Sequence, residues 1–116
     1  MKKKNKVLNN IEARNVSWTF SGIEKSFENH ISTSVPMYNE AHEIALNISD
    51  FFLKDNSKIL DIGCFTGSFL KKLILRTKKK ILKLIAVDNT SSMIKFCKKN
   101  SKLMLSKHIT FFICKN

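Results

Sequence analysis

Two aspartates and a glycine turn are the residues of this sequence with the most definite chemistry. Asp61 is followed by Gly63 and Gly67 in the pattern Asp-x-Gly-x-x-x-Gly, and Asp88 lies 21 residues beyond Gly67. Glycine adopts backbone conformations that are closed to other residues and lets a ligand approach the backbone closely. An acidic residue that ends the following strand can accept hydrogen bonds from both hydroxyls of a ribose. The pattern predicts a site for a nucleoside cofactor, with the Asp61 carboxylate in the same crevice.

A strand, a turn and a helix must position these groups. Residues 58–62 form an apolar run typical of a short buried strand, and residues 68–77 have the spacing of an amphipathic helix. The N–H groups in the first turn of such a helix are free to face a ligand. A second apolar strand over residues 82–87 leads directly to Asp88. The order strand, glycine turn, helix, strand is the one that nucleoside cofactors require.

The flanking segments extend the same pattern. Ser21-Gly-Ile-Glu24 fits a capping box, which predicts a helix over about residues 23–31. A second helix is expected from Asn39 through about residue 53, a later one after Thr90 or Ser91, and a third strand over residues 108–114. The second helix carries an apolar stripe that we expect to be buried, formed by Ala41, Ile44, Ala45, Ile48 and Phe52.

The order of elements predicts an α/β, Rossmann-like fold with about three parallel strands and N-terminal helices. We expect residues 1–20 to be a basic N-terminal tail and lead-in, and residues 21–116 to be a partial cofactor-binding domain. Doubly wound nucleotide-binding sheets usually have more than three strands, so the far side of the first strand is expected to be bare. An exposed apolar edge favours aggregation, unless the N-terminal helices or another chain cover it.

Composition limits the class of protein. The 116 residues, 43% of them hydrophobic, suffice for one small domain, and no apolar run approaches the length of a membrane span. Cys64, Cys97 and Cys114 form no CxxC pair, which indicates a reduced, cytoplasmic protein. The three histidines show no ligand spacing, so we predict no metal site.

The net charge of +12 raises the question of an anionic partner such as RNA. The chain has 19 lysines but only 2 arginines. Lysine without arginine suits a solvated surface better than bidentate recognition of phosphates or bases. A basic tRNA-associated binding module therefore stays open as an alternative to a cofactor-binding protein.

The spacing Asp-x-Gly-x-x-x-Gly resembles the first motif of S-adenosylmethionine-dependent methyltransferases. Several further stretches are similar to one family with that fold, the bacterial carboxy-S-adenosyl-L-methionine synthases. They occur in the family's order and together cover about residues 16–100. These stretches are Trp18-Thr-Phe20, Ser34-Val-Pro-Met-Tyr38, Asp61-Ile-Gly-Cys64 with the following Gly67, Ile85-Ala-Val-Asp-Asn89 and Ser92-Met-Ile94.

The resemblance implies a role for each matching residue. Tyr38 would close over the cofactor, and Gly63, Cys64 and Phe65 would line its methionine side through their backbone. Asp88 would bind the ribose hydroxyls, with Asn89 beside the adenosine.

The family's reaction is also implied. A carboxyl group derived from prephenate would be transferred to the sulfonium methyl of S-adenosylmethionine, which supplies carboxylated cofactor for modification of the tRNA wobble uridine. The cofactor is S-adenosyl-L-methionine or its carboxylated form, and the family suggests a homodimer.

The sequence departs from the family at three places. Phe65 stands where the family prefers a small residue, and no acidic residue follows the third strand. The resemblance covers only the N-terminal half of a family member, so we expect a truncated chain whose activity as a transferase depends on the missing half. A fragment of another S-adenosylmethionine-dependent methyltransferase, and a degenerate product without activity, are the other readings.

Overall fold

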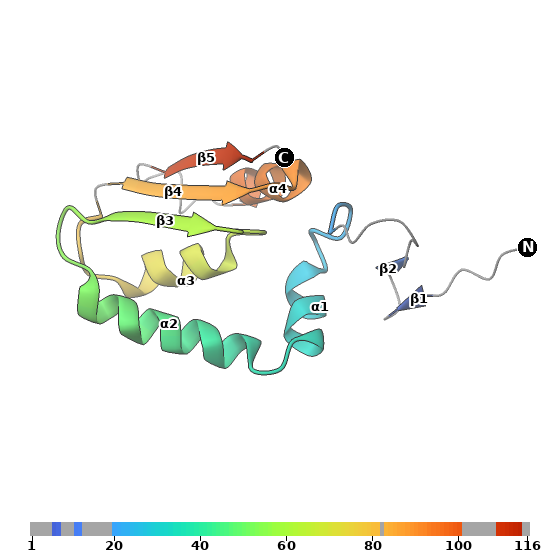
Figure 1. Cartoon of the computed structure of the whole chain (residues 1–116), viewed down its shortest axis with the longest axis horizontal. Helices are drawn as coiled ribbons and strands as arrows, with labels where there is room; N and C mark the ends of the chain where they lie inside the picture. Colours follow the sequence, from blue (N-terminus) through green and yellow to red (C-terminus); the bar gives the residue numbers. More distant parts are fainter. Residues whose placement is uncertain (1–5, 8–10, 13–19, 82, 101–108, 115–116) are drawn as a thin grey trace, which may run out of the picture.

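A three-stranded parallel sheet forms the centre of the molecule (Figure 1). The computed structural model describes residues 6–7, 11–12, 20–81, 83–100 and 109–114. The strands are β3 (Lys58–Ile62), β4 (Lys83–Asp88) and β5 (Ile109–Ile113), in the order β3-β4-β5. Asp61 pairs with Ala86, and Ala86 in turn with Phe111, so the carboxyl ends of all three strands lie at one edge. The predicted Rossmann-like α/β class is confirmed.

The described residues form four helices beside this sheet: α1 (Phe27–Ser34), α2 (Tyr38–Phe52), α3 (Ser68–Arg76) and α4 (Ser91–Asn100). The connections β3–α3–β4 and β4–α4–β5 are the expected parallel crossovers. Two further strands, β1 (Lys6–Val7) and β2 (Ile11–Glu12), form an antiparallel pair that lies apart from the sheet in Figure 1. These two-residue strands have no periodicity that the sequence could reveal. Trp18 lies outside the described residues.

The core lies between the sheet and its helices. Along β4 the side chains of Leu84, Ala86 and Asp88 are buried, whereas the alternate residues are more exposed, as expected for a strand with one covered face. Helix α3 contributes Leu70 and Leu73 to this core. The other buried members of the cluster are Leu46, Cys64, Ile74, Ile94 and Cys97.

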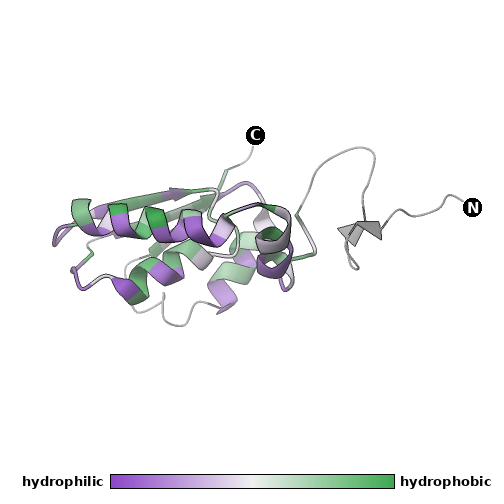
Figure 2. Ribbon diagram, turned by 90° about the horizontal axis from the view of Figure 1, so that it is seen from below, coloured by the Kyte–Doolittle hydropathy of each residue, from purple (hydrophilic) through white to green (hydrophobic). Residues whose placement is uncertain are grey.

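The predicted burial of the apolar stripe on α2 is wrong. Ile44, Ile48 and Phe52 are 55%, 54% and 69% exposed, and Leu46 is the residue of α2 that enters the core. Apolar spacing identifies the helix but not the side that meets its neighbour. On the side of Leu46, Arg76 of α3 also contacts α2, through its guanidinium to Glu43, Asn47 and Asp50. Figure 2 shows the apolar and polar bands that result along the helices.

The first helix also begins later than predicted. The chain makes turns before Phe27, and α1 runs from Phe27 to Ser34. The Glu24 carboxylate, expected to cap a helix from residue 23, instead accepts a hydrogen bond from the N–H of Gly22 at 2.8 Å. The pKa of Glu24 is lowered, chiefly by a hydrogen bond with Ser92 at the start of α4. The capping-box residues therefore hold the turn against α4.

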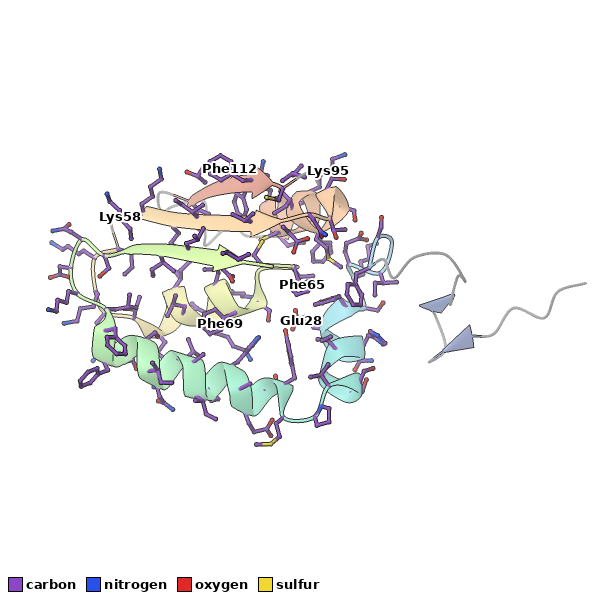
Figure 3. All side chains as sticks on the ribbon, viewed as in Figure 1. Glu28, Lys58, Phe65, Phe69, Lys95 and Phe112 are labelled. Carbon is purple, nitrogen blue, oxygen red and sulfur yellow. The ribbon has the colours of Figure 1, made fainter. Side chains whose placement is uncertain are left out.

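The second face of the sheet carries apolar side chains that the described helices leave open. Leu60 and Ile62 of β3 are 57% and 77% exposed, and Phe112 of β5 is 50% exposed. Phe112 is labelled on β5 in Figure 3. In the described part of the chain β3 pairs only with β4, so its other edge is open, as the strand count predicted. No helix among the described residues has the length and apolar character needed to span a membrane.

Candidate functional site: a cavity at the glycine turn

The turn after β3 is held against the end of β4 by backbone hydrogen bonds. The N–H groups of Gly63 and Cys64 both donate to the Val87 carbonyl oxygen, at 2.8 and 3.0 Å, and the Gly67 N–H donates to the Cys64 carbonyl at 2.7 Å. Gly63 and Gly67 have φ of +78° and +79°, a conformation in which a Cβ atom is unfavourable. Both glycines of the motif are therefore required by the turn itself.

Asp88 lies beneath this turn and is 4% exposed. One carboxylate oxygen accepts the N–H of Phe65 at 2.9 Å, and the other accepts the N–H of Thr90 at 2.8 Å. Asp88 therefore joins the glycine turn to the start of α4. Each carboxylate oxygen can accept more than one hydrogen bond, so the bonds from Phe65 and Thr90 do not use up the acceptor capacity of Asp88. The ribose-binding role implied for Asp88 stays a prediction. Asn89 is exposed, and its side-chain oxygen accepts a hydrogen bond from the Thr90 hydroxyl.

The backbone at positions 63 to 65 offers a ligand acceptors but no donors. Each of the three N–H groups is already used, by the Val87 carbonyl or by Asp88. If Gly63, Cys64 and Phe65 contact a cofactor through their backbone, they do so through carbonyl oxygens. Such oxygens accept hydrogen bonds from an ammonium group.

Phe65 explains one departure from the family pattern. Its ring points toward the N-terminal segment, where it stacks on Phe27 at 4.8 Å between ring centroids and meets Phe20 edge-on at 5.7 Å. Phe27 is fully buried and also packs edge-on against Phe20 at 5.4 Å. The three rings, which we call the aromatic clasp, fasten α1 to the glycine turn. Phe65 adopts φ of +47°, an unfavourable conformation for a residue with a side chain.

The aromatic clasp brings Glu28 to the site, next to Phe27 in the sequence. The hydroxyl of Thr66, within the glycine turn, donates to one Glu28 carboxylate oxygen at 2.5 Å. The Tyr38 hydroxyl lies 3.5 Å from the other oxygen and donates to it. Figure 3 shows Glu28 from α1, Phe65 from the turn and Phe69 from α3 gathered in one region. Helices α1 and α2 thereby face the turn with polar groups.

These groups line a cavity of about 280 Å³. Five predicted site residues lie in its wall: Tyr38, Asp61, Gly63, Cys64 and Phe65. Asp88 and Asn89 are not part of the wall. Asp88 contacts the wall residue Phe65 by accepting a hydrogen bond from its N–H. The volume suits a part of a nucleoside cofactor, since pockets for whole ligands of that size are about 300–1,000 Å³.

Sequence reasoning missed three polar residues of the wall, Glu28, His42 and Ser68. Tyr38 and His42 are one helical turn apart on α2, with ring centroids at 4.4 Å, so the spacing of the second helix could have indicated His42. Glu28 reaches the cavity through the packing of α1, which no local spacing reveals. Ser68 Oγ is buried and, among the described residues, has no partner at hydrogen-bonding geometry.

Burial shifts the pKa values of several side chains in the cavity wall. It is the main cause of the raised pKa of Asp61, and the nearby Asp88 carboxylate adds to it. Burial likewise raises the pKa of Tyr38 and, together with Lys72, lowers that of His42. The Lys72 ammonium lies 3.3 Å from His42 Nδ1. Burial also raises the pKa of Cys64 to about 12, which leaves a protonated thiol rather than a nucleophile at neutral pH.

Comparison with known proteins shows which family this chain is similar to. A family described as a methyltransferase domain matches residues 53–115, which include the glycine turn and Asp88. The chain belongs to the methyltransferase domain family. A solved structure of a methyltransferase-domain protein, an S-adenosylmethionine-dependent methyltransferase from Aquifex aeolicus, is similar with a TM-score of 0.53 and 19% identity. It covers 80% of this chain and 46% of that one, and it supports the fold.

Curated methyltransferase-fold relatives are more similar in sequence. The carboxy-S-adenosyl-L-methionine synthase of Campylobacter hominis is 41% identical over 75 residues, covering 65% of this chain and 31% of the relative. That of Nautilia profundicola is 40% identical over 76 residues, covering 66% and 32%. The resemblance to this family that the motifs indicated is confirmed, and the chain spans about a third of the length of these relatives.

Proposed function

We propose that this protein binds S-adenosyl-L-methionine in the cavity at the glycine turn. The observation that carries the proposal is the built turn itself, in which Gly63 and Gly67 take left-handed conformations and Asp88 binds the Phe65 N–H beside the cavity. Membership of the methyltransferase domain family supports it further. The proposed site uses Tyr38, Asp61, Gly63, Cys64, Phe65, Asp88 and Asn89, and adds Glu28 and Ser68.

The polar groups of the wall fit the methionine end of this cofactor. That end carries an ammonium, a carboxylate and the sulfonium. Asp61 and the carbonyl oxygens of the turn are acceptors for the ammonium, and the unpaired Ser68 hydroxyl can donate to the carboxylate. A buried hydroxyl without a partner costs free energy, which a ligand at this place would recover. The cofactor would supply a methyl group that the adjacent sulfonium acidifies, so that loss of a proton would make its carbon a nucleophile.

We further propose that the chemistry served by this site is that of the carboxy-S-adenosyl-L-methionine synthases. The carboxyl donor would be prephenate, the product would be the carboxylated cofactor, and its use would be modification of the tRNA wobble uridine. The support is the 41% identity to a synthase of that name, over 75 residues. Because the chain spans about a third of that relative, turnover of prephenate by this chain alone is a separate question from cofactor binding.

Calorimetric titration of the purified chain with S-adenosylmethionine tests the proposal. Binding should be saturable, and Asp88→Ala should abolish it because the substitution releases the Phe65 and Thr90 N–H groups. Glu40→Gln, on an exposed carboxylate in the first turn of α2 outside the cavity, should bind like the wild type. Circular dichroism of all three proteins checks folding. A folded, monodisperse wild-type chain that takes up no cofactor would refute the proposal.

Binding of tRNA is the second candidate, supported by the net charge of +12. Its affinity would fall steeply with added salt, because basic side chains release counterions from the phosphates. It would also be indifferent to Asp88→Ala in a folded sample, since Asp88 is buried and acidic. Filter binding of tRNA over a series of salt concentrations separates the two functions.

A further inference from the structure

Glu28 is an acidic side chain held at the cavity by contacts on two sides. Its neighbour Phe27 is fully buried in the aromatic clasp, and the Thr66 hydroxyl binds its carboxylate at 2.5 Å. The Thr66 and Tyr38 hydroxyls that donate to its carboxylate are neutral groups and carry no positive charge. A group whose position is fixed before the ligand arrives discriminates between ligands better than a flexible one.

The charge of the cavity wall is one-sided. Among the described residues that line it, Glu28 and Asp61 are acidic and none is lysine or arginine. Burial above all shifts the pKa values of His42 and Tyr38 toward their neutral forms, and it shifts the pKa of Asp61 toward its neutral form as well. This acidic wall lies in a chain whose net charge is +12, so the overall charge of the protein does not account for it.

The backbone of the turn points to the same kind of ligand independently. The N–H groups of Gly63, Cys64 and Phe65 are consumed by Val87 and Asp88, so these positions present acceptors only. Two carboxylates and a run of backbone acceptors favour a cation, because opposite charges attract more strongly in a partly buried site than in water. An added anionic group would meet no lysine or arginine among the described lining residues, and Lys72 contacts the wall only through His42.

We propose that Glu28 makes this site selective for a cofactor with net positive charge, namely S-adenosylmethionine over its demethylated sulfide and over its carboxylated form. The inference rests on the proposed function. The sulfonium, the ammonium and the carboxylate together give S-adenosylmethionine a net charge of +1. The sulfide has lost the sulfonium charge and the carboxylated form has gained a second carboxylate, so both have a net charge of zero. Glu28 would thus favour the substrate of the proposed reaction and weaken retention of its product.

Calorimetric titration of the full chain with each of the three compounds tests this role. The wild type should prefer S-adenosylmethionine to the sulfide, S-adenosylhomocysteine, and Glu28→Gln should reduce that preference about tenfold, or about 1.4 kcal/mol. Affinity for the sulfide should hardly change. Glu28→Asp keeps the charge and should retain a measurable part of the preference. Glu40→Gln, exposed and outside the cavity, is the matched control.

The outcomes distinguish this inference from the proposal beneath it. If the wild type binds none of the compounds, the proposed function and this inference fail together. If the wild type binds and Glu28→Gln weakens all three compounds equally, only the selectivity is refuted, and Glu28 merely supports the wall. Equal wild-type affinity for all three would also refute the selectivity while leaving cofactor binding intact.

Discussion

Replacing Phe65 by glycine should destabilise this protein less than replacing it by alanine. Either substitution removes the ring from the aromatic clasp and so deletes its contacts with Phe20 and Phe27. Only alanine retains a Cβ atom at φ of +47°, where a side chain is unfavourable. The comparison of the two variants therefore isolates the backbone conformation from the loss of the ring.

The expected magnitudes follow from the geometry. Two aromatic pairs at about 0.5–1.5 kcal/mol each give a loss of about 1–3 kcal/mol common to both variants, before the lost apolar burial is added. The left-handed conformation costs alanine about 1–2 kcal/mol more than glycine. The greater freedom of glycine in the unfolded chain offsets about 0.4–1 kcal/mol of this difference. The free energy of unfolding of Phe65→Gly should thus be about 1 kcal/mol higher than that of Phe65→Ala.

Phe69 provides a control in which the order reverses. It lies in α3 and lines the same cavity, but its backbone is helical. In a helix glycine is about 1 kcal/mol worse than alanine, so Phe69→Ala should be more stable than Phe69→Gly. Urea denaturation followed by far-UV circular dichroism measures all four variants. If alanine is as stable as glycine at Phe65 while the Phe69 pair behaves as expected, the left-handed conformation assigned to Phe65 is wrong.

Three further predictions concern charge and reactivity. Burial and Asp88 raise the folded-state pKa of Asp61, so its ionisation destabilises the fold as pH rises. Asp61→Asn should therefore raise the melting temperature at neutral pH, and this gain should shrink as the pH falls toward the ordinary pKa of 3.8. A difference in melting temperature that does not change with pH would contradict this prediction. Iodoacetamide at about pH 8 should label exposed Cys114 in the folded chain but spare buried Cys64 and Cys97, whose pKa values are raised to about 12 and about 11. Mass spectrometry measures the labelling, and early modification of the two buried thiols would contradict this prediction. Arg76→Gln should lower the free energy of unfolding, measured by urea denaturation, by less than about 1 kcal/mol, because the ion pairs of Arg76 between α3 and α2 are solvent-exposed. A loss of several kcal/mol would contradict this prediction.

The elements around the glycine turn were predictable because local signals agree there. The predicted strand over residues 58–62 coincides with β3, and the predicted helix over residues 68–77 differs from α3 only at its last residue. An apolar run, two glycines that the turn requires and an amphipathic helix follow one another without a conflicting signal. Asp61 and Asp88 meet at one edge of the sheet because β3 and β4 are parallel and in register.

The parts that sequence did not predict depend on contacts between distant segments. The side of α2 that faces α3 carries Asp50, whose partner Arg76 lies 26 residues further along the chain. Glu28 reaches Thr66 across 38 residues, because Phe27 and Phe65 stack. Phe65 stands where the family prefers a small residue, and its ring holds α1 to the turn through Phe20 and Phe27. Periodicity within one helix contains no information about such partners.

The open face of the sheet has a consequence for the colloidal behaviour of the protein. Leu60, Ile62 and Phe112 are all at least half exposed, so two copies that touch there could exclude water from apolar surface. The charge of +12 opposes that approach by mutual repulsion. Salt shortens the range of the repulsion to about 10 Å at 0.1 M and about 3 Å at 1 M, while it leaves apolar attraction in place. Light scattering should accordingly find dispersed particles in dilute buffer and growing ones as salt is added, the reverse of a protein whose association is ionic.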